Sequence, residues 1–285
     1  MGGAARGERK RRQARSGGTE RTTRPARAAR PGASAAKSPS GSAAGTGGGG
    51  RRKVLLSAVA VVVLVVAIVG GVLIANDRKN TTEGVVIQPR TVAADYPVRR
   101  DGAVVAAGND DAKVKLDLYE DFLCPVCAEF EAANAGAIEE QVRAGTVQVR
   151  YHLLPLLNDA SDPPGYSLDS ANAALCAADG GGFPAFHASL YAAQPAEGAR
   201  GYDKDQLIRL GHDVGVAGPQ FAACVTGGSH DRSVLAEYEA ARNAPYLRQP
   251  VSGGGTGFGT PTVAVGQRVV DTAQPQWLAN LVSGG

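Results

Sequence analysis

Hydrophobic and polar positions follow three different patterns along the chain, and only the last is typical of a folded domain. Residues 54–75 are apolar apart from one serine, whereas the residues before them contain almost no large apolar side chain. Beyond about residue 101, apolar positions recur at regular intervals. Residues 113–119 alternate with a period of two, which predicts a strand with one buried face. Residues 147–153 predict a second strand, and residues 128–143 between them have the apolar spacing of a helix.

The order strand, short loop, helix, strand is a βαβ unit, which implies that the two strands pair in parallel. Residues 167–244 then show helical patterns separated by breaks rich in glycine and proline. Strand character returns at residues 262–265 and 268–270, which predicts an antiparallel hairpin. A last amphipathic helix near residues 276–282 carries the only tryptophan. The sequence therefore predicts an α/β fold, in which a helical block at about residues 158–244 interrupts a small mixed sheet.

Residues 54–75 predict a transmembrane helix. They comprise 22 residues without a charge, and a helix of that length spans about 33 Å, enough for the core of a bilayer. A cleaved signal peptide would have a shorter apolar region, of about 7 to 15 residues, so an uncleaved anchor is favoured. Arg51, Arg52 and Lys53 directly precede the helix. By the positive-inside rule, the N-terminus stays in the cytoplasm and the chain from residue 76 onward is exported.

The charge is distributed unevenly. Residues 1–53 contain 14 of the 30 lysines and arginines but only two of the 27 acidic residues, and every aromatic residue lies at or after Tyr96. Such a segment cannot bury enough apolar surface to offset the entropy cost of ordering, so we expect residues 1–53 to be a disordered basic tail. Its cations favour a cytoplasmic position near anionic lipids. Without aromatic residues for base stacking, no nucleic-acid partner is expected. Residues 76–100 are rich in polar and turn-forming residues and predict a linker, which leaves residues 101–285 as the folded domain.

The four cysteines fall into two pairs. Cys124 and Cys127 enclose a short motif where a strand gives way to a helix, and unpaired N–H groups and the helix dipole stabilise a thiolate there. Cys124 is the expected exposed nucleophile, Cys127 the partner that resolves a mixed disulfide, and Pro125 suits the first helical turn because it has no N–H. A zinc site needs further ligands at a fixed spacing, so no metal is expected. Cys176 and Cys224 lie in separate predicted helices, where a structural disulfide is favoured over a second redox pair.

Three segments resemble the DsbA family of thiol:disulfide oxidoreductases in its membrane-anchored, actinobacterial type. They are residues 119–127 (YEDFLCPVC), residues 186–194 (FHASLYAAQ) and residues 259–262 (GTPT). The resemblance covers roughly residues 100–285 and implies a thioredoxin-like fold with a helical insertion. It also implies that Thr260-Pro261 is a cis peptide bond beside the first cysteine of the motif, with the backbone of the threonine docking the substrate chain.

The motif differs from the best-known oxidase motif of this family, which has histidine where Val126 stands here. Valine cannot stabilise the thiolate of Cys124 as histidine can. The helix terminus still lowers the pKa of Cys124, so we expect a value below the ordinary ~8.5. Glu120 is a candidate proton relay to Cys127, although acids at a strand end, such as Glu120 and Asp121, are more often solvated. The four histidines are expected at the surface or in packing roles.

The sequence thus predicts an exported, membrane-tethered thiol:disulfide oxidoreductase that oxidises translocated proteins through the Cys124–Cys127 disulfide. Its expected partners are unfolded exported proteins with free thiols and, as the resemblance implies, an integral-membrane, quinone-linked reoxidant of the DsbB or VKOR kind. No cofactor is expected, because the chain has no recognisable quinone or flavin motif. Two alternatives remain open: a reductase or isomerase that uses the same site, and a non-catalytic, membrane-tethered domain that binds peptides. The expected location is the cell membrane, with one span and the catalytic domain outside.

Overall fold

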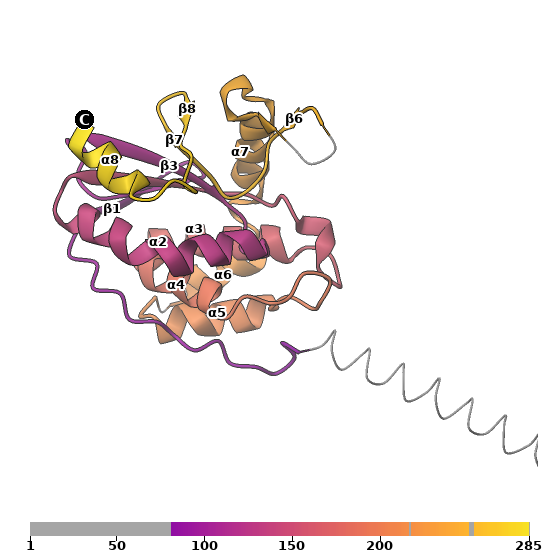
Figure 1. Ribbon diagram of the computed structural model, residues 1–285. Helices are drawn as coiled ribbons and strands as arrows, with labels where there is room; N and C mark the ends of the chain where they lie inside the picture. Colours follow the sequence, from indigo (N-terminus) through magenta and orange to yellow (C-terminus); the bar gives the residue numbers. More distant parts are fainter. Residues whose placement is uncertain (1–80, 217, 251–253, 285) are drawn as a thin grey trace, which may run out of the picture. The chain divides into compact units, whose positions relative to one another are not determined.

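The computed structural model describes residues 81–284, apart from 217 and 251–253. At its centre lies a six-stranded mixed sheet in the order β1-β2-β4-β3-β7-β8 (Figure 1). The strands are β1 (Val98–Asp101), β2 (Val104–Ala107), β3 (Val114–Glu120), β4 (Val147–Leu153), β7 (Thr262–Val265) and β8 (Arg268–Val269). β3 and β4 pair in parallel, whereas β7 runs antiparallel to β3 and to β8. A separate two-stranded sheet joins β5 (Gln249–Pro250) to β6 (Thr256–Gly257).

One face of the sheet packs against the two helices α2 (Pro125–Arg143) and α8 (Trp277–Gly284). Leu116 and Leu118, on alternate positions of β3, are fully buried in this layer. Burial of each such side chain contributes about 1.5–3 kcal/mol. Asp117 and Tyr119 on the opposite face of β3 are buried as well, so the prediction of a single buried face is wrong. α2 buries Phe130, Ile138 and Val142, whereas Ala133 and Ala137, which the helical spacing also assigned to its apolar positions, are exposed.

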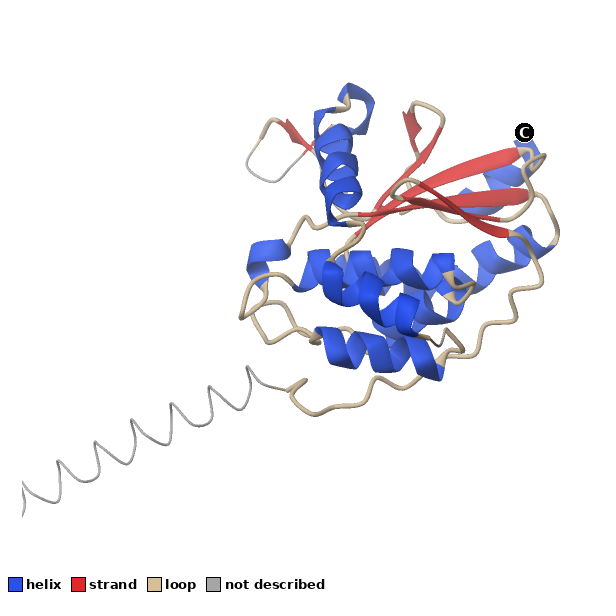
Figure 2. Ribbon diagram, turned by 180° about the vertical axis from the view of Figure 1, so that it is seen from behind, coloured by secondary structure: helices blue, strands red, loops and turns tan. Residues whose placement is uncertain are grey.

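Helices fill most of the long connection between β4 and β7, and most of them gather on one side of the sheet (Figure 2). They are η1 (Asn158–Ala160), α3 (Tyr166–Asp179), α4 (Phe183–Ala192), α5 (Lys204–Asp213), α6 (Pro219–Gly227), α7 (Asp231–Asn243) and η2 (Pro245–Leu247). α3 contacts α4, α5, α6 and α7 and is buried on almost all sides, as expected for a helix made largely of small and apolar residues. α7 stands apart and covers the other face of the sheet, where Tyr119, Ala241 and Leu247 form a separate cluster.

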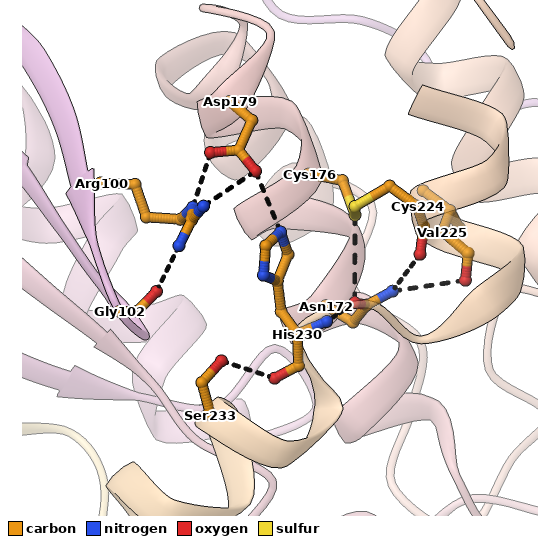
Figure 3. A network of polar contacts seen from close by, with 9 residues as sticks. All are labelled: Arg100, Gly102, Asn172, Cys176, Asp179, Cys224, Val225, His230 and Ser233. Atoms are coloured by element: carbon orange, nitrogen blue, oxygen red, sulfur yellow. Dashed lines mark hydrogen bonds and ion pairs between the residues drawn. A yellow bond between two sulfur atoms is a disulfide. The ribbon is translucent and has the colours of Figure 1, made fainter. Parts of the chain in front are cut away.

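A disulfide bond joins α3 to α6 through Cys176 and Cys224, whose Cα atoms lie 6.0 Å apart (Figure 3). Asn172, one turn earlier on α3, reinforces this junction. Its side-chain amide donates hydrogen bonds to the carbonyl oxygens of Cys224 and Val225, and its Oδ1 accepts one from the backbone N–H of His230. The three helices α3, α6 and α7 are therefore held together by one covalent bond and one buried amide.

Asp179, at the end of α3, extends this network to the sheet. The Arg100 guanidinium of β1 donates to both carboxylate oxygens, at 2.6 and 3.1 Å, and the Nε2 of His230 lies 3.0 Å from Oδ2 (Figure 3). A single carboxylate thus connects β1, α3 and the start of α7. This network lies outside the redox motif and serves the structure of the insertion.

Residues 82–97, within the stretch predicted as a linker, lie against the helical block before they reach β1 (Figure 1). The Gln206 side-chain amide of α5 donates to the carbonyl oxygens of Thr82 and Val85, each at 2.7 Å. Thr82 and Ile87 are themselves buried. We refer to residues 82–97 as the strap, because its contacts fix where the chain enters the folded domain.

The predicted tail at residues 1–53 and the predicted transmembrane helix at residues 54–75 lie outside the described residues. Within residues 81–284, apart from the gaps given above, no helix is both long and apolar enough to cross a membrane.

Candidate active site

The redox motif lies where β3 ends and α2 begins. Cys124 is the N-cap of α2, with φ −74° and ψ 115°, and Pro125 occupies the first helical turn. The loop before it is closed by the Asp121 carbonyl, which accepts a hydrogen bond from the backbone N–H of Cys124 at 3.0 Å. Proline fits this position because its missing N–H would have no partner in the first turn. The sulfur of Cys124 therefore lies at the positive end of the helix dipole.

Cys124 has the environment of a stabilised thiolate. Its pKa is lowered to about 6, chiefly by a hydrogen bond from the Cys127 thiol and further by Thr260 and by the backbone N–H groups of Cys127 and Val126, against a desolvation that raises it. The predicted direction is therefore correct even without a histidine in the motif. The expectation of an exposed nucleophile is wrong, because Cys124 is only 6% exposed whereas Val126 is 55% exposed. Surrounding residues therefore cover Cys124, whereas Val126 lies at the surface.

Cys127 has the opposite character. It lies within the first turns of α2, is fully buried and belongs to the core of the helical block. Burial, more than its interactions with Cys124 and Glu120, raises its pKa. Both residues are present as thiols. Because the pKa values of the two thiols move in opposite directions, Cys124 is the better nucleophile and Cys127 needs a proton whenever it leaves a disulfide.

The second half of the site comes from the segment that enters β7. The Thr260–Pro261 peptide bond is cis, and the carbonyl oxygen of Thr260 lies 3.3 Å from Cys124 Sγ, within reach of a hydrogen bond from the thiol. β7 is antiparallel to β3, with Thr262 opposite Tyr119. This pairing brings residues that lie 136 positions apart in the chain into contact at the motif.

Glu120 and Asp121 are both fully buried, so the expectation that acids at this strand end are solvated is wrong. The Asp121 carboxylate accepts hydrogen bonds from the N–H of Leu123 and of Leu157 and from the hydroxyl of Ser167, at 2.7–2.8 Å. Burial nevertheless raises the pKa of Asp121 to about 6. Asp121 thus ties the motif to the connection after β4 and to α3, and its partners justify its burial.

Glu120 lies on the other side of the chain and has fewer partners. Its Oε2 lies 3.0 Å from Nε2 of His187 on α4, and its Oε1 is buried without a hydrogen-bond partner among the described residues. Burial raises the pKa of Glu120 to about 8, and the charge of Cys124 adds to this increase. Glu120 is therefore protonated at neutral pH. When Glu120 is ionised, its charge interacts with the charges of both cysteines.

Two residues at this site were not predicted from the sequence. His187 is buried beside Glu120. Gln194 follows α4, and its side-chain amide donates to the carbonyl oxygens of Phe122 at 3.0 Å and Cys124 at 2.9 Å. Both belong to the segment of residues 186–194 noted for its family resemblance, but nothing in the local pattern of that segment indicates contact with the motif.

His152 is also a buried polar residue, not a surface one. Its Nε2 lies 3.0 Å from Asp117 Oδ1 and its Nδ1 lies 2.7 Å from Glu237 Oε1 of α7. These carboxylates raise the pKa of His152, although desolvation opposes them. Arg150 also donates to Asp117, at 2.5 Å. The cluster links α7 to the outer face of the sheet and does not include the cysteines of the motif.

Among the described residues, two groups have the side chains and spacing to hold a metal ion. One is formed by Cys176, Cys224 and His230, but both of its sulfurs belong to the disulfide. The other is formed by Glu120, Glu131 and His187, whose ligand atoms all lie within 4.8 Å of one another. Burial raises the pKa of both carboxyl groups of the second group, and a protonated carboxyl group is a poor metal ligand, so we do not assign it as a metal site.

Comparisons with known proteins agree with this geometry. The family model described as thioredoxin matches residues 101–278. The structure is similar to reduced DsbA from Mycobacterium tuberculosis, with a TM-score of 0.55 and 26% identity over 64% of this chain and 92% of that one. It is also similar to reduced DsbG, a disulfide bond oxidoreductase from the same organism, with a TM-score of 0.53 and 27% identity over 73% of this chain and 91% of that one.

A curated relative is the serine/threonine-protein kinase PknE of Mycobacterium tuberculosis, which is 32% identical over 197 residues. The match covers 67% of this chain, and the chain spans only 33% of the length of the kinase. The predicted thioredoxin-like fold with a helical insertion is thus confirmed by the family model and by the solved structures.

Proposed function

The chain belongs to the thioredoxin family, its folded domain is that of a DsbA-like protein-disulfide oxidoreductase, and we propose that the whole protein oxidises the thiols of exported proteins. The observation that carries the oxidising direction is the contrast within the motif. The pKa of Cys124 is lowered to about 6, whereas burial raises that of Cys127. A thiolate at Cys124 stabilises the reduced pair, and a pair with a stable reduced form is a strong oxidant as its disulfide. The site is therefore suited to donating its disulfide.

The cycle begins with the Cys124–Cys127 disulfide. A substrate thiolate attacks Cys124 Sγ, a mixed disulfide forms, and the electron pair of the broken bond passes to Cys127 Sγ. A second substrate thiolate then attacks the substrate sulfur of the mixed disulfide, which forms the substrate disulfide and releases Cys124 as a thiolate. Two electrons have moved from the substrate to the protein. The lowered pKa of Cys124 favours this last step because a thiol of low pKa is a good leaving group.

Glu120 supplies the proton that Cys127 requires. The thiolate of Cys127 forms in a fully buried position, where an unneutralised charge is strongly disfavoured. Glu120 is buried nearby with a pKa of about 8 and is protonated at neutral pH. It donates its proton to Cys127 when the disulfide opens, and it recovers that proton when Cys127 attacks again during reoxidation.

The substrate docks beside Thr260. The backbone of Thr260 lies just before β7 and next to Cys124, so an extended substrate chain can add to the sheet at this point. The side chain of Val126, in the first turn of α2, is exposed. A valine there favours contact with unfolded segments that present apolar residues, which fits unfolded exported proteins with free thiols as the substrates.

The sequence supports a location at the cell membrane as part of this proposal. The 22 uncharged residues at 54–75 and the cations before them favour a single span with a cytoplasmic N-terminus. Disulfides persist in the compartment that this orientation gives to the domain, in agreement with the Cys176–Cys224 bond. The reduced pair is reoxidised there by an integral-membrane, quinone-linked partner of the DsbB or VKOR kind, which accepts the two electrons.

Alkylation trapping in intact cells tests the oxidising direction. The full chain carries Cys176→Ser and Cys224→Ser, so that only the redox motif reports. We expect Cys124 and Cys127 to be mostly oxidised in growing cells. A pair that is mostly reduced would instead assign the site to a reductase or isomerase that receives electrons across the membrane.

The same strain with Cys124→Ser separates catalysis from simple peptide binding. We expect this substitution to abolish the oxidation of exported proteins, because Cys127 alone cannot form the disulfide that the motif donates. Full retention of function would assign the domain to a non-catalytic binding role.

A further inference from the structure

Three polar side chains from three elements meet behind Cys127: Glu120 at the end of β3, Glu131 on α2 and His187 on α4. The Oε1 of Glu120 is buried without a hydrogen-bond partner among the described residues, yet the Glu131 carboxyl group lies next to it. Two carboxyl groups in contact in the protein interior cannot both be ionised. At least one of these two carboxyl groups is therefore protonated, and burial raises the pKa of both.

The position of Glu131 connects this proton to the redox motif. Glu131 follows Cys127 by four residues on α2, so the two side chains lie one turn apart on the same face of the helix. Glu120 approaches that face from the sheet and raises the pKa of Cys127. Tyr191 of α4 is within electrostatic reach of Glu120, Cys127 and Glu131 alike. A line of titratable groups therefore runs from Cys127 through Glu120 to Glu131.

The far end of this line opens toward solvent. Glu131 is partly exposed, whereas Glu120 is not. A cavity of about 60 Å³ adjoins the cluster and is lined by Glu131 and His187 together with Tyr96 of the strap, Glu139 of α2, and Tyr151 and Phe183. Several of these lining residues carry polar groups, and the cavity is large enough for water.

We propose that Glu131 is the residue through which the buried Glu120 exchanges its proton with solvent, and that His187 is a positioning residue that holds Glu120 toward Cys127. This inference rests on the proposed role of Glu120 as the acid that protonates Cys127. It adds the route by which Glu120 regains a proton from solvent after it has protonated Cys127. Without such a route, Glu120 would remain an unneutralised ion in the core for as long as the cysteine pair stays reduced.

The proton movements balance in both directions. When the disulfide opens, the Glu120 proton moves to Cys127 Sγ, the Glu131 proton moves to Glu120, and Glu131 takes up one proton from bulk solvent through the cavity. During reoxidation the thiol proton of Cys127 leaves by the same groups in reverse order. His187 does not carry the proton, because burial lowers its pKa and keeps the imidazole neutral. The other titratable groups that face the cluster are Tyr96, Cys124, Asp121, Glu139, Tyr151 and Tyr191.

The matched variants Glu131→Gln and Glu129→Gln test this route. Both remove one acid from α2 near Cys127, but Glu129 is exposed and does not belong to the cluster. The oxidised full chain is mixed with an excess of a fluorescent dithiol peptide. The rate at which the peptide reduces the Cys124–Cys127 disulfide is followed from about pH 5 to about pH 9, in ordinary and in deuterated water. Since general acid–base groups contribute roughly 10²–10⁴-fold to a rate, we expect Glu131→Gln to slow the reaction at least about tenfold and to alter its pH profile and isotope effect.

Glu129→Gln should follow the wild-type profile. If Glu131→Gln gave the same pH profile and isotope effect as Glu129→Gln while the wild type reacted normally, the proposed route would be wrong and the oxidoreductase function would stand. If the wild type failed to react with the peptide, the proposed function itself would be wrong. We expect His187→Leu to slow the reaction, whereas His187→Gln, which keeps a hydrogen-bonding group, should retain most of the wild-type rate.

Discussion

Cys124 and Cys127 are separated by two residues, yet their thiols have opposite acidities. The N-cap position gives Cys124 the N–H groups of the first helical turn, whereas one turn later Cys127 has no such groups and is buried in the helical block. The same helix therefore stabilises one thiolate and disfavours the other. The motif has valine where the best-known oxidase motif has histidine. The hydrogen bond from the Cys127 thiol is instead the largest single cause of the lowered pKa of Cys124.

Removal of the Cys127 thiol should therefore raise the pKa of Cys124. We expect Cys127→Ala to move it upward from about 6 and Cys127→Ser, which keeps a donor, to move it less. The ultraviolet absorbance of the thiolate, followed against pH, measures the shift. Val126→Ala is the control, because it leaves the backbone N–H of residue 126 in place. An unchanged pKa in Cys127→Ala would mean that the helix terminus alone sets the acidity.

Gln194 acts on the backbone of the same loop. Its amide is the side-chain donor to the carbonyl oxygens of Phe122 and Cys124, and loss of a buried hydrogen-bond partner costs about 1–3 kcal/mol. We expect Gln194→Ala to lower the free energy of unfolding by that amount and to slow thiol exchange with a dithiol peptide. Urea denaturation and the exchange rate measure the two effects. Gln88→Ala, whose side chain bonds only to an exposed carbonyl, should change neither, and equal behaviour of both variants would contradict the role given to Gln194.

At the scale of elements, the sequence predicts what depends on local pattern. The period of two in β3 and the helical spacing of α2 are local patterns, so the βαβ unit is predicted close to its observed bounds and the insertion is predicted to be helical. β1 and β2 are not predicted, because each has four residues without clear alternation. The burial of Asp121 is not predicted either. Its partners Leu157 and Ser167 lie 36 and 46 residues away, so the compensation for a buried acid is invisible in the local sequence.

The Cys176–Cys224 bond belongs to the element scale because it joins α3 to α6. It closes a loop of 48 residues, for which the chain-entropy model gives a stabilisation of about 4 kcal/mol. We expect Cys176→Ser with Cys224→Ser to lower the free energy of unfolding in urea by that order. Exchange by the Cys124–Cys127 pair should be retained below the new transition, because Asn172 still links α3 to α6 and α7. Loss of exchange in the folded double variant would mean that this bond takes part in the redox reaction.

At the scale of the whole molecule, folding and redox state are linked through protons. The folded protein holds reduced Cys124 with a pKa of about 6, against 9.0 for an ordinary cysteine thiol, whereas the oxidised form has no such thiol. A group whose pKa is lowered by folding adds stability that is complete above its unfolded value and is lost as the pH falls through its folded value. The contribution of Cys124 therefore grows between pH 6 and 9 in the reduced form only. Burial raises the pKa of Glu120, and this contribution has the opposite sign and is present in both forms.

The difference in stability between the two forms should consequently depend on pH. We expect the free energy of unfolding of the reduced protein to rise relative to that of the oxidised protein as the pH increases from about 6 to 9.0. Urea denaturation of both forms across this range measures the difference, in which the common contribution of Glu120 largely cancels. Cys124→Ser cannot form this thiolate, so its free energy of unfolding should not show the rise seen for the reduced wild type. A difference that stayed constant with pH would mean that folding does not stabilise the thiolate, and the driving force for donating the disulfide would then have to lie outside Cys124.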